Sequence, residues 1–257
     1  MKPPITTEKV AGVEPLLWAS FRGYSLLFDN PGKSLAATPG RLNLSCDVDG
    51  DPQLGFYRAL KEGIGKDETK MLVEKFMYCP LPTFSYHVTA WDGGNDYNLR
   101  AVGEACRHQL QSLFTGLPDS LGESYLLTDM ILSSPLVTQK NWSLHFKFRN
   151  LIKWDDGLGA ELVPDGKESG EALKIFAEER SQFIKRYRQN FGIGLTEEYR
   201  PHVSLGYFAN AQVATEMASL MESWDKRMKQ QMDGFTLSFN TISLYGFTDM
   251  ATFFKTG

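Results

Sequence analysis

The chain has 257 residues, of which 23% are charged and 12% aromatic, with a formal net charge of −4. This composition is typical of a folded globular protein and excludes a disordered or fibrous one. The negative net charge argues against a broad basic surface for long nucleic acid, whereas a small phosphate ester in a local positive pocket is compatible with it.

The N-terminal residues and the cysteines indicate in which cell compartment we expect the protein. The start of the chain lacks the continuous apolar core of a secretion signal, and no window approaches 18 unbroken apolar residues, so we expect no membrane association. The sequence has three cysteines, an odd number, at the widely spaced positions Cys46, Cys79 and Cys106, and they include no Cys-x-x-Cys pair. This pattern is typical of reduced thiols, and we expect a cytoplasmic protein.

The first half of the chain mixes strand and helix patterns. Gly, Pro, Ser and Asn are frequent in residues 31–51, and Asp51-Pro52 is typical of a helix start because Asp caps and Pro fits the first turn. The predicted elements are, in order, a strand over 21–28, a long loop over 31–51, a helix beginning at Asp51-Pro52, strands over 71–77 and 84–91, and a helix over 99–113.

The second half repeats this mixture. Residues 142–148 (WSLHFKF) alternate strictly between apolar and polar side chains, and residues 169–191 carry one apolar side at helical spacing, on which Arg180 also falls. The predicted elements are strands over 125–132 and 142–148, a helix over 169–191, a strand over 202–208, a helix over 212–231, and a closing strand or hairpin over 235–246.

The order of elements runs roughly twice through the same pattern. In each half a Pro-containing approach leads to a His-bearing strand, then a turn, then a helix. The sequence therefore predicts an α+β protein, a single bilobal domain over 1–257. Two antiparallel sheets would face a central cleft, with the helices on the outside.

Two of the four histidines lie in closely similar settings, Tyr-His87-Val-Thr89 and Pro-His202-Val-Ser204. Residues i and i+2 of a strand point to the same side, so each imidazole shares a face with its own hydroxyl. Two such strands facing one another would place two imidazoles and two hydroxyls around one cavity.

This set of side chains suits phosphodiester hydrolysis without a metal or another cofactor. A neutral imidazole takes the proton of the attacking water, and a protonated one gives a proton to the departing oxygen. Two nearby imidazoles resist double protonation, which favours one neutral and one charged ring. The hydroxyls of Thr89 and Ser204 can donate to the non-bridging phosphate oxygens.

The residues HVTAW and RPHVSLGYF resemble the paired His-x-Ser/Thr motifs of the two-histidine phosphoesterase superfamily, which includes the RNA ligase-like 2′,3′-cyclic phosphodiesterases. The Leu-Pro-x-x-x-Tyr-His run before the first motif is similar to an uncharacterised bacterial and fungal branch. The resemblance implies a bilobal fold with the motifs lining a cleft, metal-independent hydrolysis, and site roles for His87, Thr89, His202 and Ser204. Two departures are the Ser at position 204, where Thr is common, and a longer region over 31–75.

Four further residues are candidates for substrate binding, each with a structural alternative. Arg200 shares the strand parity of His202 and could clamp a phosphate, or it could form a surface ion pair with Glu197 or Glu198. Trp91 shares the parity of His87 and could stack a base, or it could fill the core. Tyr24 is a weaker candidate of the same kind.

The fourth candidate lies on the polar side of the strand over 142–148. Ser143, His145 and Lys147 share that side, and Lys147 would hold a phosphate if it faced the cleft; the alternative is a strand with one solvated face. His108, in a helix, is expected to be a solvated residue.

We therefore expect a cyclic phosphodiesterase-like hydrolase, a monomer that acts on a small nucleotide or a short RNA end. The sequence leaves open which histidine is the acid, and the natural substrate. A nucleotide-binding module with little turnover is the alternative, and a metal hydrolase that uses the same histidines is a third possibility. Zinc sites need three or four closely spaced ligands, which the sequence does not offer locally.

Overall fold

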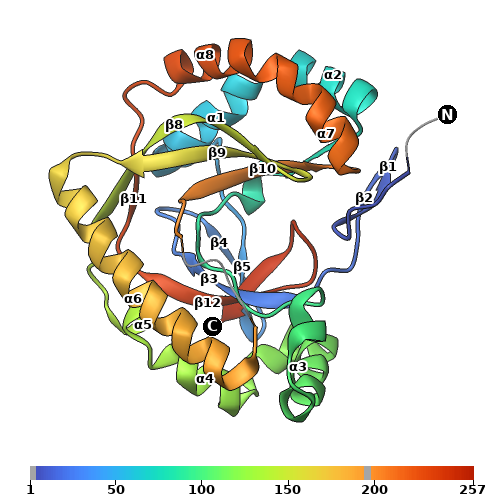
Figure 1. Cartoon of the computed structure of the whole chain (residues 1–257). Helices are drawn as coiled ribbons and strands as arrows, with labels where there is room; N and C mark the ends of the chain where they lie inside the picture. The colour runs from blue at the N-terminus through green and yellow to red at the C-terminus, as the bar shows by residue number, and fades with distance from the viewer. Residues whose placement is uncertain (1–3, 194–197) are drawn as a thin grey trace.

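The computed structural model describes residues 4–193 and 198–257, apart from the side chains of 125–128, and it confirms the α+β class. A five-stranded antiparallel sheet has the order β11 (Leu237–Phe239), β8 (Leu144–Trp154), β9 (Gly157–Pro164), β10 (His202–Phe208) and β6 (Tyr78–Pro80). A six-stranded antiparallel sheet has the order β4 (Leu35–Thr38), β5 (Arg41–Leu44), β13 (Phe253–Thr256), β12 (Ile242–Phe247), β3 (Gly23–Phe28) and β7 (Thr89–Trp91). A hairpin of β1 (Val10–Val13) and β2 (Leu16–Trp18) stands apart near the N-terminus (Figure 1).

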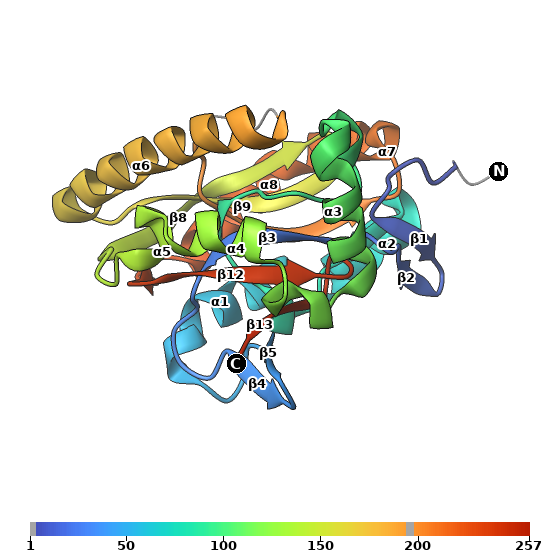
Figure 2. The same ribbon diagram turned by 90° about the horizontal axis from the view of Figure 1, so that it is seen from below.

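The helices lie on the outer sides of the two sheets (Figures 1 and 2). On the side of the five-stranded sheet lie α1 (Gly55–Ile64), α2 (Lys66–Phe76), α7 (Ala211–Met217) and α8 (Met221–Gln231). On the side of the six-stranded sheet lie α3 (Glu104–Gly116), α4 (Tyr125–Leu132) and α5 (Pro135–Thr138), while α6 (Lys167–Phe191) also packs on β8 and β9. Short 3₁₀ turns are η1 (Pro52–Leu54), η2 (Thr83–Ser85), η3 (Asn98–Ala101), η4 (Asp119–Gly122) and η5 (Ala218–Leu220).

The long helix α6 follows from its apolar stripe. Phe176, Phe183 and Tyr187 are spaced along one side and are fully buried, because that side packs on aromatic residues of the strands. The helix ends at Gly192, whose left-handed φ of 74° lets its N–H close back on the Arg188 carbonyl. None of the helices in the described ranges has the length and apolar character that a membrane crossing requires.

Two sequence predictions in the first half were wrong. Residues 31–51 are not a continuous loop, because β4 and β5 form a hairpin whose Pro39-Gly40 turn uses a positive φ at Gly40. Residues 71–77 are not a strand. They lie mostly in α2, where Leu72 is buried and charged residues occupy the outer face, so the apolar run has helical rather than alternating periodicity.

Three further predictions need correction. Residues 125–132 form helix α4 and not a strand. Only Thr89–Trp91 of the segment 84–91 is a strand, since η2 occupies its start. The closing segment 235–246 is not a hairpin, because β11 joins the five-stranded sheet and β12 the six-stranded one, and β13 follows.

Candidate active site

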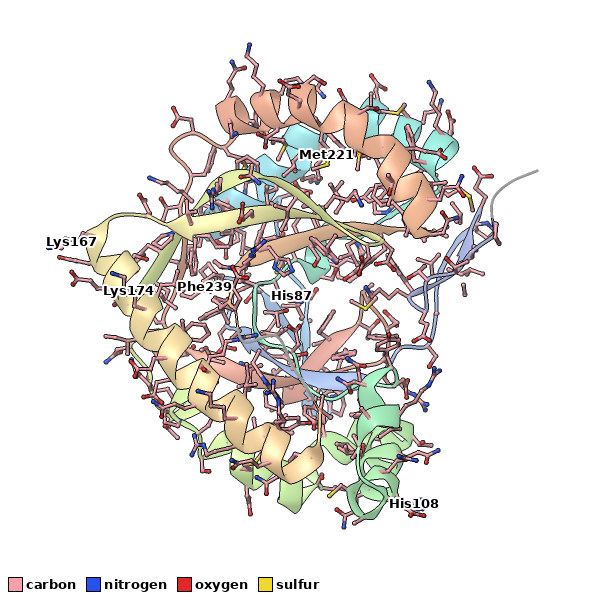
Figure 3. All side chains as sticks on the ribbon, in the orientation of Figure 1. His87, His108, Lys167, Lys174, Met221 and Phe239 are labelled. Atoms are coloured by element: carbon pink, nitrogen blue, oxygen red, sulfur yellow. The ribbon has the colours of Figure 1, made fainter. Side chains whose placement is uncertain are left out.

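The two His-x-Ser/Thr motifs meet in space at a backbone bridge between the sheets. Val88, directly before β7, pairs with Val203 of β10 in an isolated antiparallel bridge, and both side chains are fully buried. Antiparallel register then sets position 87 opposite 204 and position 89 opposite 202 on the other face. All four motif residues line one cavity of about 690 Å³, with walls from both sheets. Figure 3 shows His87 in the space between the sheets.

The first imidazole is oriented by the turn that precedes it. Nδ1 of His87 lies 2.7 Å from the carbonyl oxygen of Ser85, at the end of η2. A carbonyl only accepts, so Nδ1 carries the proton and Nε2 is left for the cavity. The same approach segment is tied to the second motif, because the N–H of Leu81 donates to the carbonyl of Leu205.

The second imidazole repeats this construction. Nδ1 of His202 lies 2.9 Å from the carbonyl oxygen of Arg200, again two residues earlier. Each ring also packs on an aromatic neighbour, His87 on Phe253 with centroids 4.4 Å apart and His202 on Trp154 with centroids 5.0 Å apart. Both imidazoles are therefore held in one tautomer, with Nε2 as the atom available for proton transfer.

The surroundings of His87 determine its protonation state. Desolvation lowers the pKa of His87 to about 4, and the nearby His202 contributes to that direction, while the Ser85 carbonyl opposes it. His87 is therefore neutral at physiological pH. A neutral ring with a free Nε2 is suited to accept a proton.

The two hydroxyls lie beside the rings, and each is partly exposed to the cavity. Ser204 shares the cavity with Tyr207, a buried residue whose ring centroid lies 4.3 Å from the Lys9 ammonium. The Thr89 and Ser204 hydroxyls come from opposite sheets, so a tetrahedral oxyanion between the rings could receive hydrogen bonds from both sides.

A β-bulge follows the hydroxyl in each motif and moves Trp91 out of the site. Leu27 pairs with Thr89 and Leu26 with Trp91, so Ala90 is the extra residue, and the second motif has the same irregularity after Ser204. A bulge reverses the face that later side chains share. Trp91 is fully buried against α6, so the prediction that it stacks a base at the cleft mouth was wrong and it fills the core instead.

Tyr24 is also a core residue, which corrects its assignment to substrate binding. It is 1% exposed, packs on Trp91 and shares a hydrogen bond with the hydroxyl of Tyr187. Both hydroxyls are thus satisfied inside the protein.

The two cationic candidates differ in position. Arg200 is exposed beside the cleft, where its guanidinium forms an ion pair with Glu198 at 3.0 Å; Glu197 lies outside the described residues. Lys147 is exposed and pairs with Asp165, and it lines neither cavity that touches the motifs, so it lies on a solvated strand face. Its assignment as a phosphate ligand was therefore wrong.

The remaining two histidines lie elsewhere. Nδ1 of His145 contacts the Ser238 hydroxyl across the β8–β11 pair, at 2.7 Å. His108 is exposed on α3, as expected, at the periphery of the molecule (Figure 3).

Three residues that sequence reasoning did not select also shape the site: Arg180, Tyr199 and Trp154. Nε of the buried Arg180 donates to the carbonyl of Ala90, and the Tyr199 hydroxyl donates to the carbonyl of Thr89, each at 2.9 Å. The Arg180 guanidinium also lies over the Tyr199 ring, 5.1 Å from its centroid. One feature of the sequence indicates that Arg180 has a specific role: it is an arginine on the apolar side of α6.

The Tyr199 hydroxyl bond can be tested by a single atom deletion. Tyr199→Phe keeps the ring that packs on Phe176 but leaves the Thr89 carbonyl without this donor, so we expect a loss of about 1 kcal/mol in the free energy of unfolding. Urea denaturation measures it. Tyr97→Phe, on an exposed tyrosine, is the matched control and should unfold like the wild type. Equal midpoints for all three proteins would show that the bond does not hold the motif.

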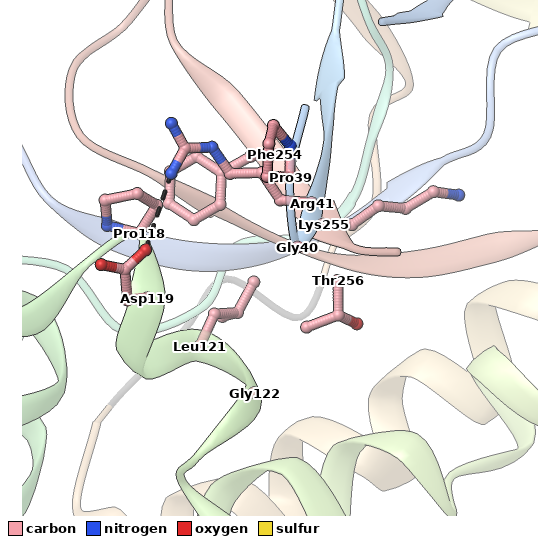
Figure 4. Close-up of a pocket in the computed structure, with 10 residues that line it drawn as sticks. All are labelled: Pro39, Gly40, Arg41, Pro118, Asp119, Leu121, Gly122, Phe254, Lys255 and Thr256. Atoms are coloured by element: carbon pink, nitrogen blue, oxygen red, sulfur yellow. Dashed lines mark ion pairs between the residues drawn. The ribbon is translucent and has the colours of Figure 1, made fainter. Parts of the chain in front are cut away.

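Other features of the surface do not join the site. A separate pocket of about 240 Å³ lies where the β4–β5 turn meets η4, with an ion pair between Arg41 and Asp119, and it shares no lining residue with the histidine cavity (Figure 4). Within residues 4–193 and 198–257, no cluster of three or more His, Cys, Asp or Glu side chains has the arrangement of a metal site.

Comparison with known proteins identifies the fold and not the activity. No protein-family model matches the chain, and no curated protein matches it. Among solved structures, the chain is similar to a conserved protein of unknown function from Agrobacterium tumefaciens, with a TM-score of 0.58 over 98% of this chain and 91% of that one. The two sequences are 12% identical, so this likeness shows the fold alone.

Proposed function

We propose that the chain is a two-histidine phosphodiesterase that hydrolyses nucleoside phosphodiesters, with a nucleoside 2′,3′-cyclic phosphate as its compact substrate. The single observation that carries the proposal is the Val88–Val203 bridge, which sets His87, Thr89, His202 and Ser204 around one cavity. The resemblance of the two motifs to the two-histidine phosphoesterases supports the same conclusion.

The lowered pKa of His87 assigns it the role of the base, which leaves the role of the acid to His202. His87 is neutral because burial lowers its pKa, so Nε2 of His87 takes a proton from the attacking water as its oxygen bonds to phosphorus. His202, as the imidazolium, gives its Nε2 proton to the ester oxygen whose bond to phosphorus breaks. The two histidines together gain one proton and give one up. The hydrolysis yields a phosphomonoester and an alcohol, which remain in one molecule when the ester is cyclic.

The walls of the large cavity support a nucleoside as part of the substrate. Aromatic rings of Phe21, Tyr97, Phe247 and Phe253 line it, together with the amides of Asn95 and Asn98. Flat apolar faces bind a base by stacking, and side-chain amides can pair with its polar edge. The volume of about 690 Å³ is within the range of small-molecule sites.

The direct test is turnover of adenosine, uridine, guanosine and cytidine 2′,3′-cyclic phosphates, followed by chromatography. We expect conversion to the nucleoside monophosphate, equal with and without a chelator, because the four motif side chains supply the proton transfers and the phosphate contacts. Calorimetry with the same nucleotides runs in parallel. Binding without product would favour the nucleotide-binding module, and product lost with chelator would favour a metal hydrolase.

A further inference from the structure

The backbone on both sides of His87 is held by the end of β3 and the residues that follow it. The N–H of Phe28 donates to the Val88 carbonyl at 3.1 Å. In a regular antiparallel ladder, the N–H two residues later would donate to the carbonyl two residues earlier on the partner strand. At this place the side chain of Asn30 supplies the donor, because its amide nitrogen lies 2.7 Å from the Tyr86 carbonyl oxygen. The carbonyls before and after His87 are therefore both held from one segment.

The Asn30 side chain is itself fixed by its neighbours. It is only 9% exposed, and the hydroxyl of Tyr57, on α1, donates to its amide oxygen at 2.6 Å. The Tyr86 carbonyl only accepts, so the amide nitrogen must face Tyr86 and the amide oxygen must face Tyr57. The orientation of the amide is thus determined from both ends, and a buried polar chain runs from α1 to the first motif.

A thiol adds to the same contact. Sγ of Cys46 lies 3.5 Å from the Tyr86 carbonyl oxygen, and the N–H of Cys46 donates to the Phe84 carbonyl at 2.9 Å. Burial raises the pKa of the Cys46 thiol to about 12, so the thiol stays protonated and can donate. The Tyr86 carbonyl therefore has two side-chain donors, from Asn30 and Cys46.

The peptide group between Tyr86 and His87 sets the direction of the imidazole. Nδ1 of the ring contacts the Ser85 carbonyl, and this contact requires that the backbone of Tyr86, which lies between them, keeps its conformation. A rotation of that peptide group would turn the Cα–Cβ bond of His87 and displace Nε2. A displacement of about 1 Å in a reacting group can lower a rate about 100-fold. Asn30 does not line the cavity, so it can act on the ring only through the backbone.

We propose that Asn30 is a positioning residue for the base. Its side-chain amide takes the place of a backbone donor and fixes the peptide group that carries His87. The inference rests on the proposed function, in which Nε2 of His87 takes the proton of the attacking water. Tyr57 acts one step farther away, because it fixes the amide of Asn30. Neither residue contacts the substrate.

The test removes the same donor from two buried asparagines. Asn30→Asp keeps an oxygen that accepts from Tyr57, but its carboxylate cannot donate to the Tyr86 carbonyl. With adenosine 2′,3′-cyclic phosphate as the probe, we expect this variant to lower kcat about 10- to 100-fold, because the base is displaced. KM should stay within about twofold of the wild type, since the hydroxyls that would contact the phosphate are unchanged.

The control is Asn210→Asp. Asn210 is 6% exposed, its amide nitrogen donates to the Pro4 carbonyl at 2.8 Å, and its amide oxygen accepts from the N–H of Val213 at 3.0 Å. The substitution again keeps the acceptor and removes a donor to a backbone carbonyl, but at the start of α7. This variant should keep the wild-type kcat.

A second measurement does not depend on turnover. Nitrogen NMR at pH 7.5 shows which ring nitrogen of His87 carries the proton. We expect Nδ1 in the wild type and in Asn210→Asp, and a mixture of both tautomers in Asn30→Asp, because the contact with the Ser85 carbonyl is loosened.

A second pair of variants serves if Asn30→Asp does not fold. Tyr57→Phe removes the hydroxyl that holds the amide of Asn30. Tyr78→Phe removes a buried hydroxyl that has no hydrogen-bond partner within residues 4–193 and 198–257. We expect a lower kcat and mixed tautomers in Tyr57→Phe, and neither change in Tyr78→Phe.

The outcomes separate the positioning role from the function on which it rests. Equal kcat in Asn30→Asp and Asn210→Asp, or a single Nδ1 tautomer in Asn30→Asp, would overturn the role of Asn30 while the proposed function stands. A raised KM with an unchanged kcat would overturn it as well. A wild type that hydrolyses no nucleoside cyclic phosphate would reject the proposed function, and the NMR measurement would still decide whether Asn30 orients the ring.

Discussion

His87→Asn and His202→Asn are each expected to lower kcat for a nucleoside cyclic phosphate by about 10²–10⁴-fold, the usual contribution of a positioned acid or base. Asparagine is the substitution that removes only the reactive nitrogen. Its side-chain amide can still donate to the Ser85 or Arg200 carbonyl that orients each ring, but it has no group in the place of Nε2. The orientation of the loop is kept while the proton transfer is removed. Steady-state hydrolysis measures the loss.

The double variant and a surface control complete this experiment. Two residues that act on one transition state lose less together than the product of their separate losses, so the double variant should be little worse than either single one. His108→Asn carries the same change on the exposed face of α3 and should retain wild-type kcat. Turnover by the double variant at the wild-type rate would reject the two-histidine mechanism.

Activity should persist to unusually low pH for a histidine base. With a pKa of about 4 for His87, roughly 90% of the ring is still neutral at pH 5, whereas a histidine near 6.5 would be about 3% neutral. The acidic limb of kcat/KM therefore falls through about pH 4 and not near 6.5. Besides Tyr97 and Tyr207, the titratable groups that line the same cavity are His202, Asp92, Asp155, Asp156, Glu8 and Lys9. A limb centred at 6 or above would contradict the assignment of His87 as the neutral base.

The same shift predicts a change of stability with pH. The folded pKa of His87 lies below the unfolded value near 6.5, so between these values the unfolded chain binds more protons than the folded one. The wild type should therefore lose stability as pH falls from about 6.5 to 4, and this group has no effect above that window. Thermal unfolding of the wild type and His87→Asn at pH 4.5 and 7.5 isolates the contribution. A pH dependence that is the same in both proteins would show that His87 is not its source.

The sequence was sufficient to predict that each motif histidine and its hydroxyl residue share one face of a strand, because this pattern is short and local. A period of two holds from 87 to 89 and from 202 to 204, ahead of the bulges, so the shared face of each His and hydroxyl was predictable. The same rule failed at Trp91 because Ala90 is inserted between. A bulge depends on how the neighbouring strand pairs, which one strand's sequence does not show.

Other failures have a different cause. Residues 71–77 and 125–132 are short apolar runs, for which strand and helix periodicity are hard to distinguish. In the folded protein both segments are helical. Arg180 and Tyr199 reach the first motif from far along the chain, through bonds to backbone carbonyls. No spacing within the sequence encodes such a contact, because it depends on how α6 and the following segment lie across the sheets.

The bridge between Val88 and Val203 has a consequence for the protein as a whole. Each sheet contributes one imidazole to the cavity, and the two motifs meet at a single pair of residues that are remote in the chain. In the proposed mechanism both histidines are needed, so no fragment that ends before β10 is expected to retain activity. Enzymatic activity would then be a measure of complete folding. The recovery of activity during refolding would mark the moment at which the two sheets dock.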